Sequence, residues 1–196
     1  RPVLALLFRL GAAEEALAIA SAAPDTASAS TRARALYVAG SVAAATGRLE
    51  MAVARLVEGD GLRPGHPETL NNLAFCLASV PGEELRAFAV ARRATELNPK
   101  DPEFWETRAL CARRAGDPED EARSLRILLE EGTGAESEVR ARLELRLAAA
   151  LADGGDTGEA LRMAERLSVS DASQSVRAEA EALRRRLESA SRATPR

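Results

Sequence analysis

The chain has 196 residues, of which 46% are apolar but only 3% aromatic. Its core must therefore be built from alanine, leucine and valine, which suits closely packed helices better than a β-sandwich. The formal net charge of −3 excludes an overall basic field that would attract nucleic acid or an anionic membrane.

A spacing of small residues recurs along the chain, beginning in the N-terminal stretch RPVLALLFRLG and continuing to near the C-terminus. A glycine is followed five residues later by an alanine, and successive copies lie about 34 to 39 residues apart. A fixed period of this length is typical of helical repeat arrays. The copies are Gly11–Ala16, Gly47–Ala52, Gly82–Ala87, Gly116–Ala122 (with one extra residue) and Gly155–Ala160.

Each copy predicts a helix, a turn and a second helix. In TRARALYVAGSVAAATG, apolar and small residues fall on one face at helical spacing, and Gly47 ends that helix. In RLEMAVARLVEG, Ala52, Leu56 and Gly59 form one stripe. Pro64 then closes the unit, because proline cannot continue a helix interior. Small residues at fixed points let neighbouring helices approach closely.

The segment ARRATELNPKDPEFW, residues 91–105, looks like the seam between two such units, with Asn-Pro closing one and Trp105 opening the next. This pattern resembles the tetratricopeptide repeat of bacterial proteins. The resemblance implies an all-α fold, a right-handed α-solenoid of helix-turn-helix repeats with a C-terminal capping helix. It predicts a single solenoid over residues 1–190, made of a truncated repeat at 1–24, repeats at 33–66, 67–101, 102–135 and 141–170, and a capping helix at 172–190, followed by a disordered tail at 191–196.

Three features depart from the family pattern. Arg108 stands where the family has a buried leucine, and the turn GDPEDEA carries one extra residue. The segment EEGTGAES, residues 130–137, replaces the proline-closed end with a longer loop. We therefore expect a bend or shift between the 102–135 repeat and the next one.

Few residues could carry chemistry, and we predict no enzyme activity, no cofactor and no metal. His66 is the only histidine and lies between two prolines in a predicted exposed loop. A zinc site would need three or four nitrogen or sulfur ligands. Cys76 and Cys111 occupy equivalent points on the first helices of adjacent repeats, which predicts buried free thiols. The glycine-containing segments do not follow a strand, as a phosphate-binding loop would.

The remaining candidate surface is the concave groove that the first helices line in this family. Tyr37 and Phe75 beside Asn71 would suit an extended peptide or a partner helix, since aromatic rings supply contact area and the amide pairs with backbone. The alternative is that they are ordinary groove-wall residues. The resemblance implies that the groove is lined by Arg34, Tyr37, Ser41, Glu68, Asn71, Phe75, Glu103, Glu106, Leu110, Arg113 and Arg142.

One subclass of the family is disfavoured by the charges in this groove. Chaperone-binding members hold a C-terminal carboxylate with lysine, asparagine and arginine. Asn72 matches the shared asparagine, but Glu103 and Thr107 stand where the next repeat should supply cations. A carboxylate would therefore meet a like charge.

The sequence thus predicts a non-enzymatic protein–protein interaction scaffold, or a structural or assembly subunit of a larger bacterial complex, that binds a protein by its groove or solenoid edge. Two alternatives remain open, an RNA-binding helical repeat protein and a regulatory domain of a larger enzyme. The acidic balance and the lack of a basic stripe disfavour RNA. No apolar run approaches the ~20 residues of a membrane span. The cytoplasmic and periplasmic sides of a bacterial envelope both stay open, because a targeting segment can precede Arg1.

We expect the N-terminal edge to present an apolar face that associates with other protein. A repeat cannot bury its apolar face alone, and the repeat at 1–24 is truncated. We expect Val3, Leu4, Leu7 and Phe8 to be covered by missing sequence or by another subunit.

Overall fold

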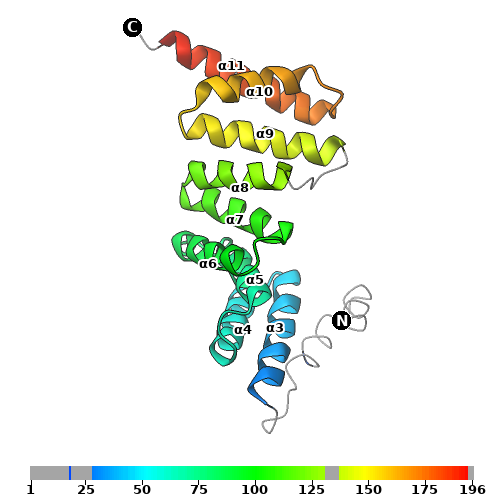
Figure 1. Ribbon diagram of the computed structural model, residues 1–196, viewed down its shortest axis with the longest axis vertical. Coiled ribbons are helices and arrows are strands. Elements are labelled where there is room, and N and C mark those ends of the chain that lie inside the picture. Colours follow the sequence, from blue (N-terminus) through cyan, green and yellow to red (C-terminus); the bar gives the residue numbers. More distant parts are fainter. Residues whose placement is uncertain (1–17, 19–27, 131–136, 194–196) are drawn as a thin grey trace. The chain divides into compact units, whose positions relative to one another are not determined.

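A computed structural model describes Ala18 and residues 28–130 and 137–193. These residues form nine helices and no strand, which confirms the predicted all-α fold (Figure 1). The helices are α3 (Ala29–Ala45), α4 (Leu49–Leu62), α5 (Pro67–Leu77), α6 (Glu84–Leu97), α7 (Pro102–Ala115), α8 (Pro118–Glu130), α9 (Ser137–Asp153), α10 (Thr157–Ser168) and α11 (Gln174–Ala193).

Some predictions fall outside these residues. Apart from Ala18, the truncated repeat at 1–24 is not described, and neither are its edge residues Val3, Leu4, Leu7 and Phe8. Helix α11 continues past residue 190 to Ala193, and residues 194–196 of the predicted tail lie outside the described residues.

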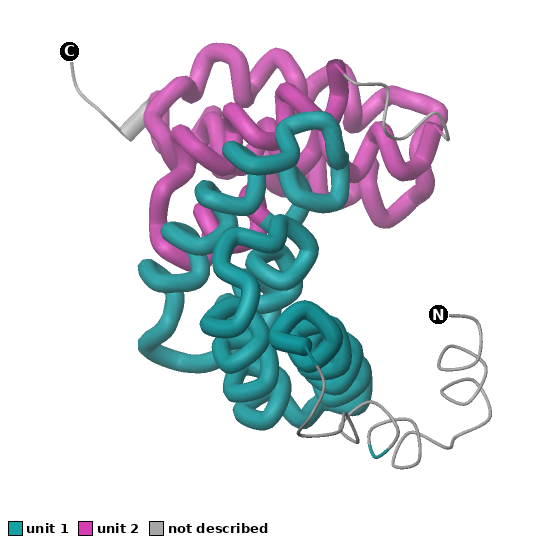
Figure 2. The backbone as a smooth tube through the Cα atoms, turned by 60° about the horizontal axis from the view of Figure 1, so that its bottom comes forward, with its two compact units in different colours: residues 1–107 teal, residues 108–196 magenta. Residues whose placement is uncertain are grey.

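The chain divides into two compact units, Arg1–Thr107 and Arg108–Arg196, with the boundary inside α7 (Figure 2). In the first unit α3 packs on α4, α4 on α5 and α5 on α6. In the second unit α8 packs on α9, α9 on α10 and α10 on α11. Successive helices therefore pack on one another, as in a helical repeat array. The single continuous solenoid and its right-handed sense stay predictions.

Glycine makes the tight turn inside several helix pairs, as the spacing predicts. Gly47 has φ 76° and Gly155 has φ 90°, a left-handed conformation that other residues rarely adopt. After the first, Arg48 N–H donates to Ala43 O (2.9 Å), and after the second, Asp156 N–H donates to Leu151 O (2.8 Å). This is the Schellman arrangement, which satisfies carbonyls left open at the helix end.

Small residues allow close packing between α3 and α4. A Cβ atom added to Gly40 would lie 2.6 Å from Leu56 Cγ, which is closer than packed atoms come. Leu56 and Ala52 are themselves fully buried. The predicted reason for a small residue at this point of the repeat is therefore confirmed by the geometry.

Arg108, which stands where the family pattern has a buried leucine, has an ion-pair partner on the next helix. Arg108 is buried, and its Nε and Nη2 donate to the two oxygens of buried Asp120 at 2.7 Å and 2.6 Å. Asp120 N–H donates in turn to Asp117 Oδ1 (2.9 Å), within the turn that carries the extra residue. An ion pair thus joins α7 to α8 where the family pattern has an apolar contact.

Helix α11 covers the last helix pair of the second unit. Val176 and Ala180 are fully buried against Ala141 of α9 and Leu167 of α10. Glu138 of α9 accepts hydrogen bonds from the backbone N–H (2.9 Å) and hydroxyl (2.8 Å) of Ser173, just before α11 begins. Both the apolar stripe and this cap therefore hold α11 in place.

Candidate partner-binding surface

Helices α3 and α5 of the first unit enclose a small hollow of about 240 Å³. We call it the α3–α5 hollow. Phe75 is its largest apolar lining residue and is 49% exposed. Two of the predicted groove residues, Ser41 and Phe75, therefore meet at one place. The hollow is lined by Ser41, Ala44, Ala45, Asn72, Phe75 and Cys76.

A chain of hydrogen bonds fixes the polar side of the hollow. Asn72 Nδ2 donates to Ser41 Oγ (2.9 Å), and Ser41 Oγ donates to the backbone oxygen of Tyr37 (2.8 Å). These bonds tie α5 to α3 and hold the Asn72 amide in one orientation. Sequence reasoning noticed Asn72 for its family match but did not place it among the groove residues.

Tyr37 does not line this hollow. Its ring makes an edge contact with His66, with ring centroids 6.2 Å apart and planes at 61°. His66 Nδ1 also lies 3.3 Å from Glu68 Oε2 and 3.2 Å from Thr69 Oγ1. Tyr37 and Phe75 therefore do not line one hollow. Tyr37 clusters with His66, whereas Phe75 lies beside Ser41.

Asn71 is buried, with 7% of its surface exposed, so little of its amide is open to a partner. Its Oδ1 atom has no hydrogen-bond partner among the described residues. The helical spacing placed Asn71 on the same face as Phe75. Its burial depends on how neighbouring side chains close over it, which spacing does not determine.

The other predicted groove residues are placed as follows. Arg34, Glu103 and Glu106 are exposed in the first unit. In the second unit Arg113 is exposed and Leu110 is partly buried. Arg142 is exposed and its Nη2 lies 3.1 Å from Glu138 Oε1. These charged residues offer solvated surface but line no hollow with Phe75.

Among the described residues, His66 and the two cysteines are placed unfavourably for nucleophilic chemistry. His66 is the N-cap of α5 and partly buried, unlike the exposed loop residue we expected. The hydroxyl beside it belongs to Thr69, which is only 4% exposed and closed to a substrate. Burial raises the pKa of Cys76 to about 11 and of Cys111 to about 12, so both free thiols are poor nucleophiles near neutral pH. Within the described part of the chain, no group of His, Cys, Asp and Glu could hold a metal ion.

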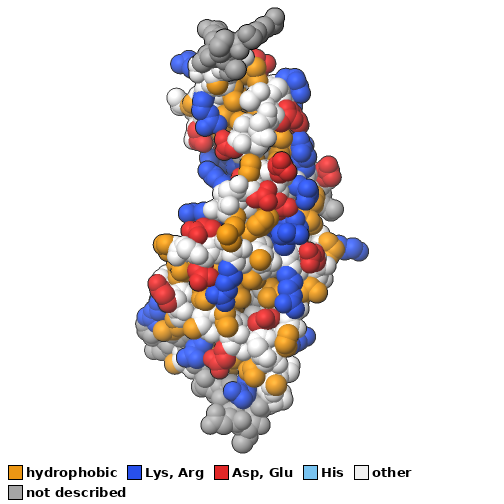
Figure 3. All heavy atoms as spheres, turned by 90° about the vertical axis from the view of Figure 1, so that its left-hand side faces the viewer, with side chains coloured by type: hydrophobic (Ala, Val, Ile, Leu, Met, Phe, Trp, Pro, Cys, Tyr) orange, Lys and Arg blue, Asp and Glu red, His pale blue; other side chains and the backbone are white. Residues whose placement is uncertain are grey.

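Charge and hydropathy complete the description of the surface. On the face in Figure 3, arginine and acidic side chains are interspersed over both units, without a continuous basic stripe. Among the helices of the described residues, none is both long and apolar enough to cross a membrane.

Comparison with solved structures identifies the class of fold. The chain is similar to the MamA RS-1 ArsTM double mutant, with a TM-score of 0.69 and 17% identity over 96% of this chain and 94% of that one. It is similar to YrrB, described as a TPR protein with an unusual peptide-binding site, with a TM-score of 0.68 and 19% identity over 97% and 89% of the two chains. TTC0263, a TPR protein of Thermus thermophilus, gives a TM-score of 0.58 and 17% identity over 93% and 95%.

These likenesses show that the fold is that of tetratricopeptide-repeat proteins, as the small-residue spacing predicts. No protein-family model matches the sequence. Nor does any curated protein match it. At identities below 20% the shared feature is the arrangement of helices. Function has to be argued from the residues of this chain.

Proposed function

We propose that this protein is a non-enzymatic interaction scaffold that binds an extended segment of a partner protein at the α3–α5 hollow. The observation that carries the proposal is Phe75, a large apolar side chain left half exposed at the wall of an open hollow. Aromatic side chains in such positions supply much of the energy of protein recognition. The likeness to YrrB, a TPR protein with an unusual peptide-binding site, supports the same class of function.

The polar side of the hollow favours a peptide backbone as the ligand. A side-chain amide has two donor hydrogens and an acceptor oxygen, and the bond to Ser41 uses one donor. One donor and the acceptor therefore remain, which matches the C=O and N–H groups of an extended segment. The apolar lining residues Ala44, Ala45 and Phe75 would contact an apolar side chain of that segment. A terminal carboxylate is a poorer ligand, because none of the residues that line the hollow carries a positive charge.

The test begins with partner capture from an extract of the source organism, followed by titration of the purified partner. Phe75→Ala should weaken binding by about 2 kcal/mol, roughly thirtyfold, because it removes the aromatic anchor. Glu103→Ala should have a smaller effect, since an exposed charge chiefly tunes rate and specificity. Leu85→Ala is the matched control, because Leu85 is an apolar residue that is 74% exposed on α6, away from the hollow. Equal affinity of Phe75→Ala and the parent would move the binding surface elsewhere.

A titration with RNA distinguishes the protein-binding scaffold from the alternative of an RNA-binding repeat protein. Binding of homopolymer RNA that weakens steeply with salt would favour an RNA-binding repeat protein. The interspersed charges on the face shown in Figure 3 favour a protein partner instead.

A further inference from the structure

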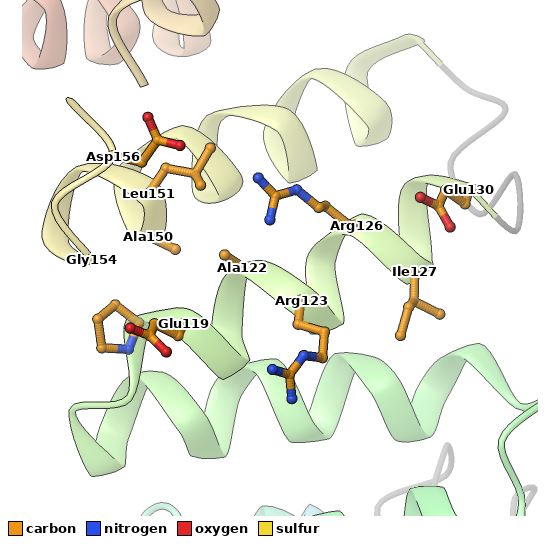
Figure 4. A pocket seen from close by; sticks show the side chains of 11 residues that line it. Glu119, Ala122, Arg123, Arg126, Ile127, Glu130, Ala150, Leu151, Gly154 and Asp156 are labelled. Carbon is orange, nitrogen blue, oxygen red and sulfur yellow. The ribbon is translucent and has the colours of Figure 1, made fainter. Parts of the chain in front are cut away.

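A second hollow lies in the other unit, between α8 and the C-terminal end of α9. It has a volume of about 460 Å³, and we call it the α8–α9 groove. Figure 4 shows α8 along one side, and Ala150, Leu151 and the turn with Gly154 and Asp156 on the other. The site in the first unit does not involve any of these residues.

The groove exists because small residues leave its floor unfilled. Ala122 of α8 faces Ala150 of α9 across the gap, and Leu151 closes one side (Figure 4). These three side chains are almost fully buried, at 3%, 2% and 6% exposure. Ile127 is partly open. The floor is therefore apolar and shallow, and suits one apolar side chain better than a packed helix.

Carboxylates stand at both ends of the groove, with two arginines between them. Arg126 Nη2 lies 2.9 Å from Glu159 Oε2, whereas Arg123 Nη1, 3.3 Å from Asp120 Oδ1, shares that carboxylate with Arg108. Among the described residues, Glu119 and Glu130 have no ion-pair partner, and they stand at opposite ends in Figure 4. Asp156 adds a third carboxylate, which also caps α10 by accepting from Glu159 N–H (3.1 Å). Three carboxylates against two arginines leave the lining of the groove with a net negative charge.

The spacing of the two glutamates limits the form of the ligand. Glu130 follows Glu119 by eleven positions along α8, which is a rise of about 16 Å at 1.5 Å per residue. An extended segment advances about 3.3 Å per residue, so five steps span the same distance. Side chains alternate between the two faces of an extended segment, so basic residues that both face the groove stand an even number of positions apart. Separations of four and six residues, about 13 and 20 Å, bracket this distance.

We propose that the α8–α9 groove binds a short extended protein segment with basic residues four or six positions apart and an apolar residue on the same face between them. The apolar side chain lies on the Ala122–Leu151 floor beside Ile127. The basic side chains pair with Glu130 at one end and with Glu119 and Asp156 at the other. The Arg126–Glu159 pair is at the surface and stabilises little, so the ligand can rearrange it at small cost.

The test screens the purified full chain against an immobilised positional-scanning library of heptapeptides. The expected result is enrichment of lysine or arginine at two positions four or six residues apart, with leucine, isoleucine, valine or methionine on the same face between them. Titration of the best peptide should then shift the methyl NMR signals of Ile127 and Leu151. Binding should weaken as salt is raised, because the charges at the rim are solvent-exposed.

Three variants make the test specific. Glu130→Lys should weaken the selected peptide by about tenfold, because it reverses a charge at one end. The helix should tolerate it, since a cation is favourable at a helix C-terminus. Glu119→Gln should weaken binding at the other end by a smaller factor. Glu165→Lys, an equal reversal at an exposed site on α10, is the control and should change affinity by less than about twofold.

Several results would overturn the proposal. They are the absence of any enriched peptide, enrichment of acidic peptides, and equal affinities for Glu130→Lys and the parent. A selected peptide that is lost with Phe75→Ala would belong to the α3–α5 hollow instead. Because that hollow lies in the other unit, failure of one site leaves the other proposal standing.

Discussion

At the scale of single residues, the buried pair of Arg108 and Asp120 shows why one departure from a repeat pattern requires another. An arginine at an apolar position would be costly to bury without a partner. Asp120, in the first turn of α8, accepts two short hydrogen bonds from the Arg108 guanidinium, one on each carboxylate oxygen. The arginine alone could be seen in the sequence, but its partner depends on how the longer turn places the start of α8.

The pair can be tested by removing one partner or both. Arg108→Leu or Asp120→Ala alone should lower the free energy of unfolding by about 3 kcal/mol or more, because each removes one partner of a buried, two-bonded ion pair. The double variant should recover much of that loss, since an apolar pair of similar volume is often as stable. Urea unfolding measures all three. Arg86→Ala, which removes an exposed pair with Glu83, is the control and should change little. Additive losses in the double variant would contradict the pairing.

Two glutamates of the second unit should respond to pH in opposite directions. Burial raises the pKa of Glu121, although Arg113 and Arg146 partly offset it. A raised folded-state pKa stabilises the fold below the unfolded pKa of about 4.3, and this contribution is lost as pH rises through the folded value. Glu121→Gln should therefore make the protein more stable than the parent at pH 7, with the difference vanishing toward pH 4.

Glu138 provides the opposite case. Hydrogen bonds from Ser173 lower its pKa, so its stabilising effect is present at neutral pH and is lost as pH falls through the folded value. Glu138→Gln should destabilise the protein at pH 7. Thermal unfolding of both variants between pH 4 and pH 7 gives the comparison. The same sign of change for both variants at pH 7 would mean that burial and hydrogen bonding do not control these carboxyls.

At the scale of elements, the position of a glycine decides whether it can be replaced. Gly40 of α3 lies against Leu56, and an added Cβ would be 2.6 Å from Leu56 Cγ and 2.9 Å from Leu56 Cδ2. Gly61 of α4 has nothing within 4 Å of the same added atom. Both lie in helices, so the backbone favours alanine at each, although less strongly at Gly61, one residue before the end of α4.

The two substitutions should therefore have opposite signs. Gly40→Ala should destabilise, because overpacking a core costs about 1–3 kcal/mol and exceeds the gain in helix propensity. Gly61→Ala should stabilise by about 0.5–1 kcal/mol. Chemical unfolding of both variants gives the comparison. A stabilised Gly40→Ala variant would show that α3 and α4 can separate at this point without cost.

Element spacing also explains how much of the site could be predicted. A glycine–alanine period determines where helices end and which faces meet, so the turns and the α3–α4 contact followed from sequence. The role of Tyr37 did not follow, because its contact with His66 depends on the path of the α4–α5 connection. The α8–α9 groove was also missed. It arises where small residues of α8, α9 and the following turn leave space between them, and no local sequence pattern marks such a space.

At the scale of the whole molecule, a repeat array is stabilised only by contacts between neighbouring elements, so its ends are special. The described C-terminal end is covered by α11, whose buried stripe contains Val176 and Ala180. Its remaining surface carries ion pairs such as those of Glu181 with Arg184 (2.8 Å) and Arg185 (2.7 Å). These hydrogen bonds lower the pKa of Glu181 to about 2. This outer face of α11 is therefore charged and solvated.

The capping role predicts the result of opening this end. Val176→Asp would place an unpaired charge against Ala141 and Leu167. It should cost about 3 kcal/mol or more of stability and release α11. The freed apolar stripe should then bind a hydrophobic dye and promote association in sedimentation measurements, because a contiguous apolar patch favours self-association. Gln174→Asp puts the same charge on the exposed first turn of α11, where the helix dipole favours it, and should do neither. A Val176→Asp variant that stays monomeric and as stable as the parent would show that the second unit does not need α11 as its cap.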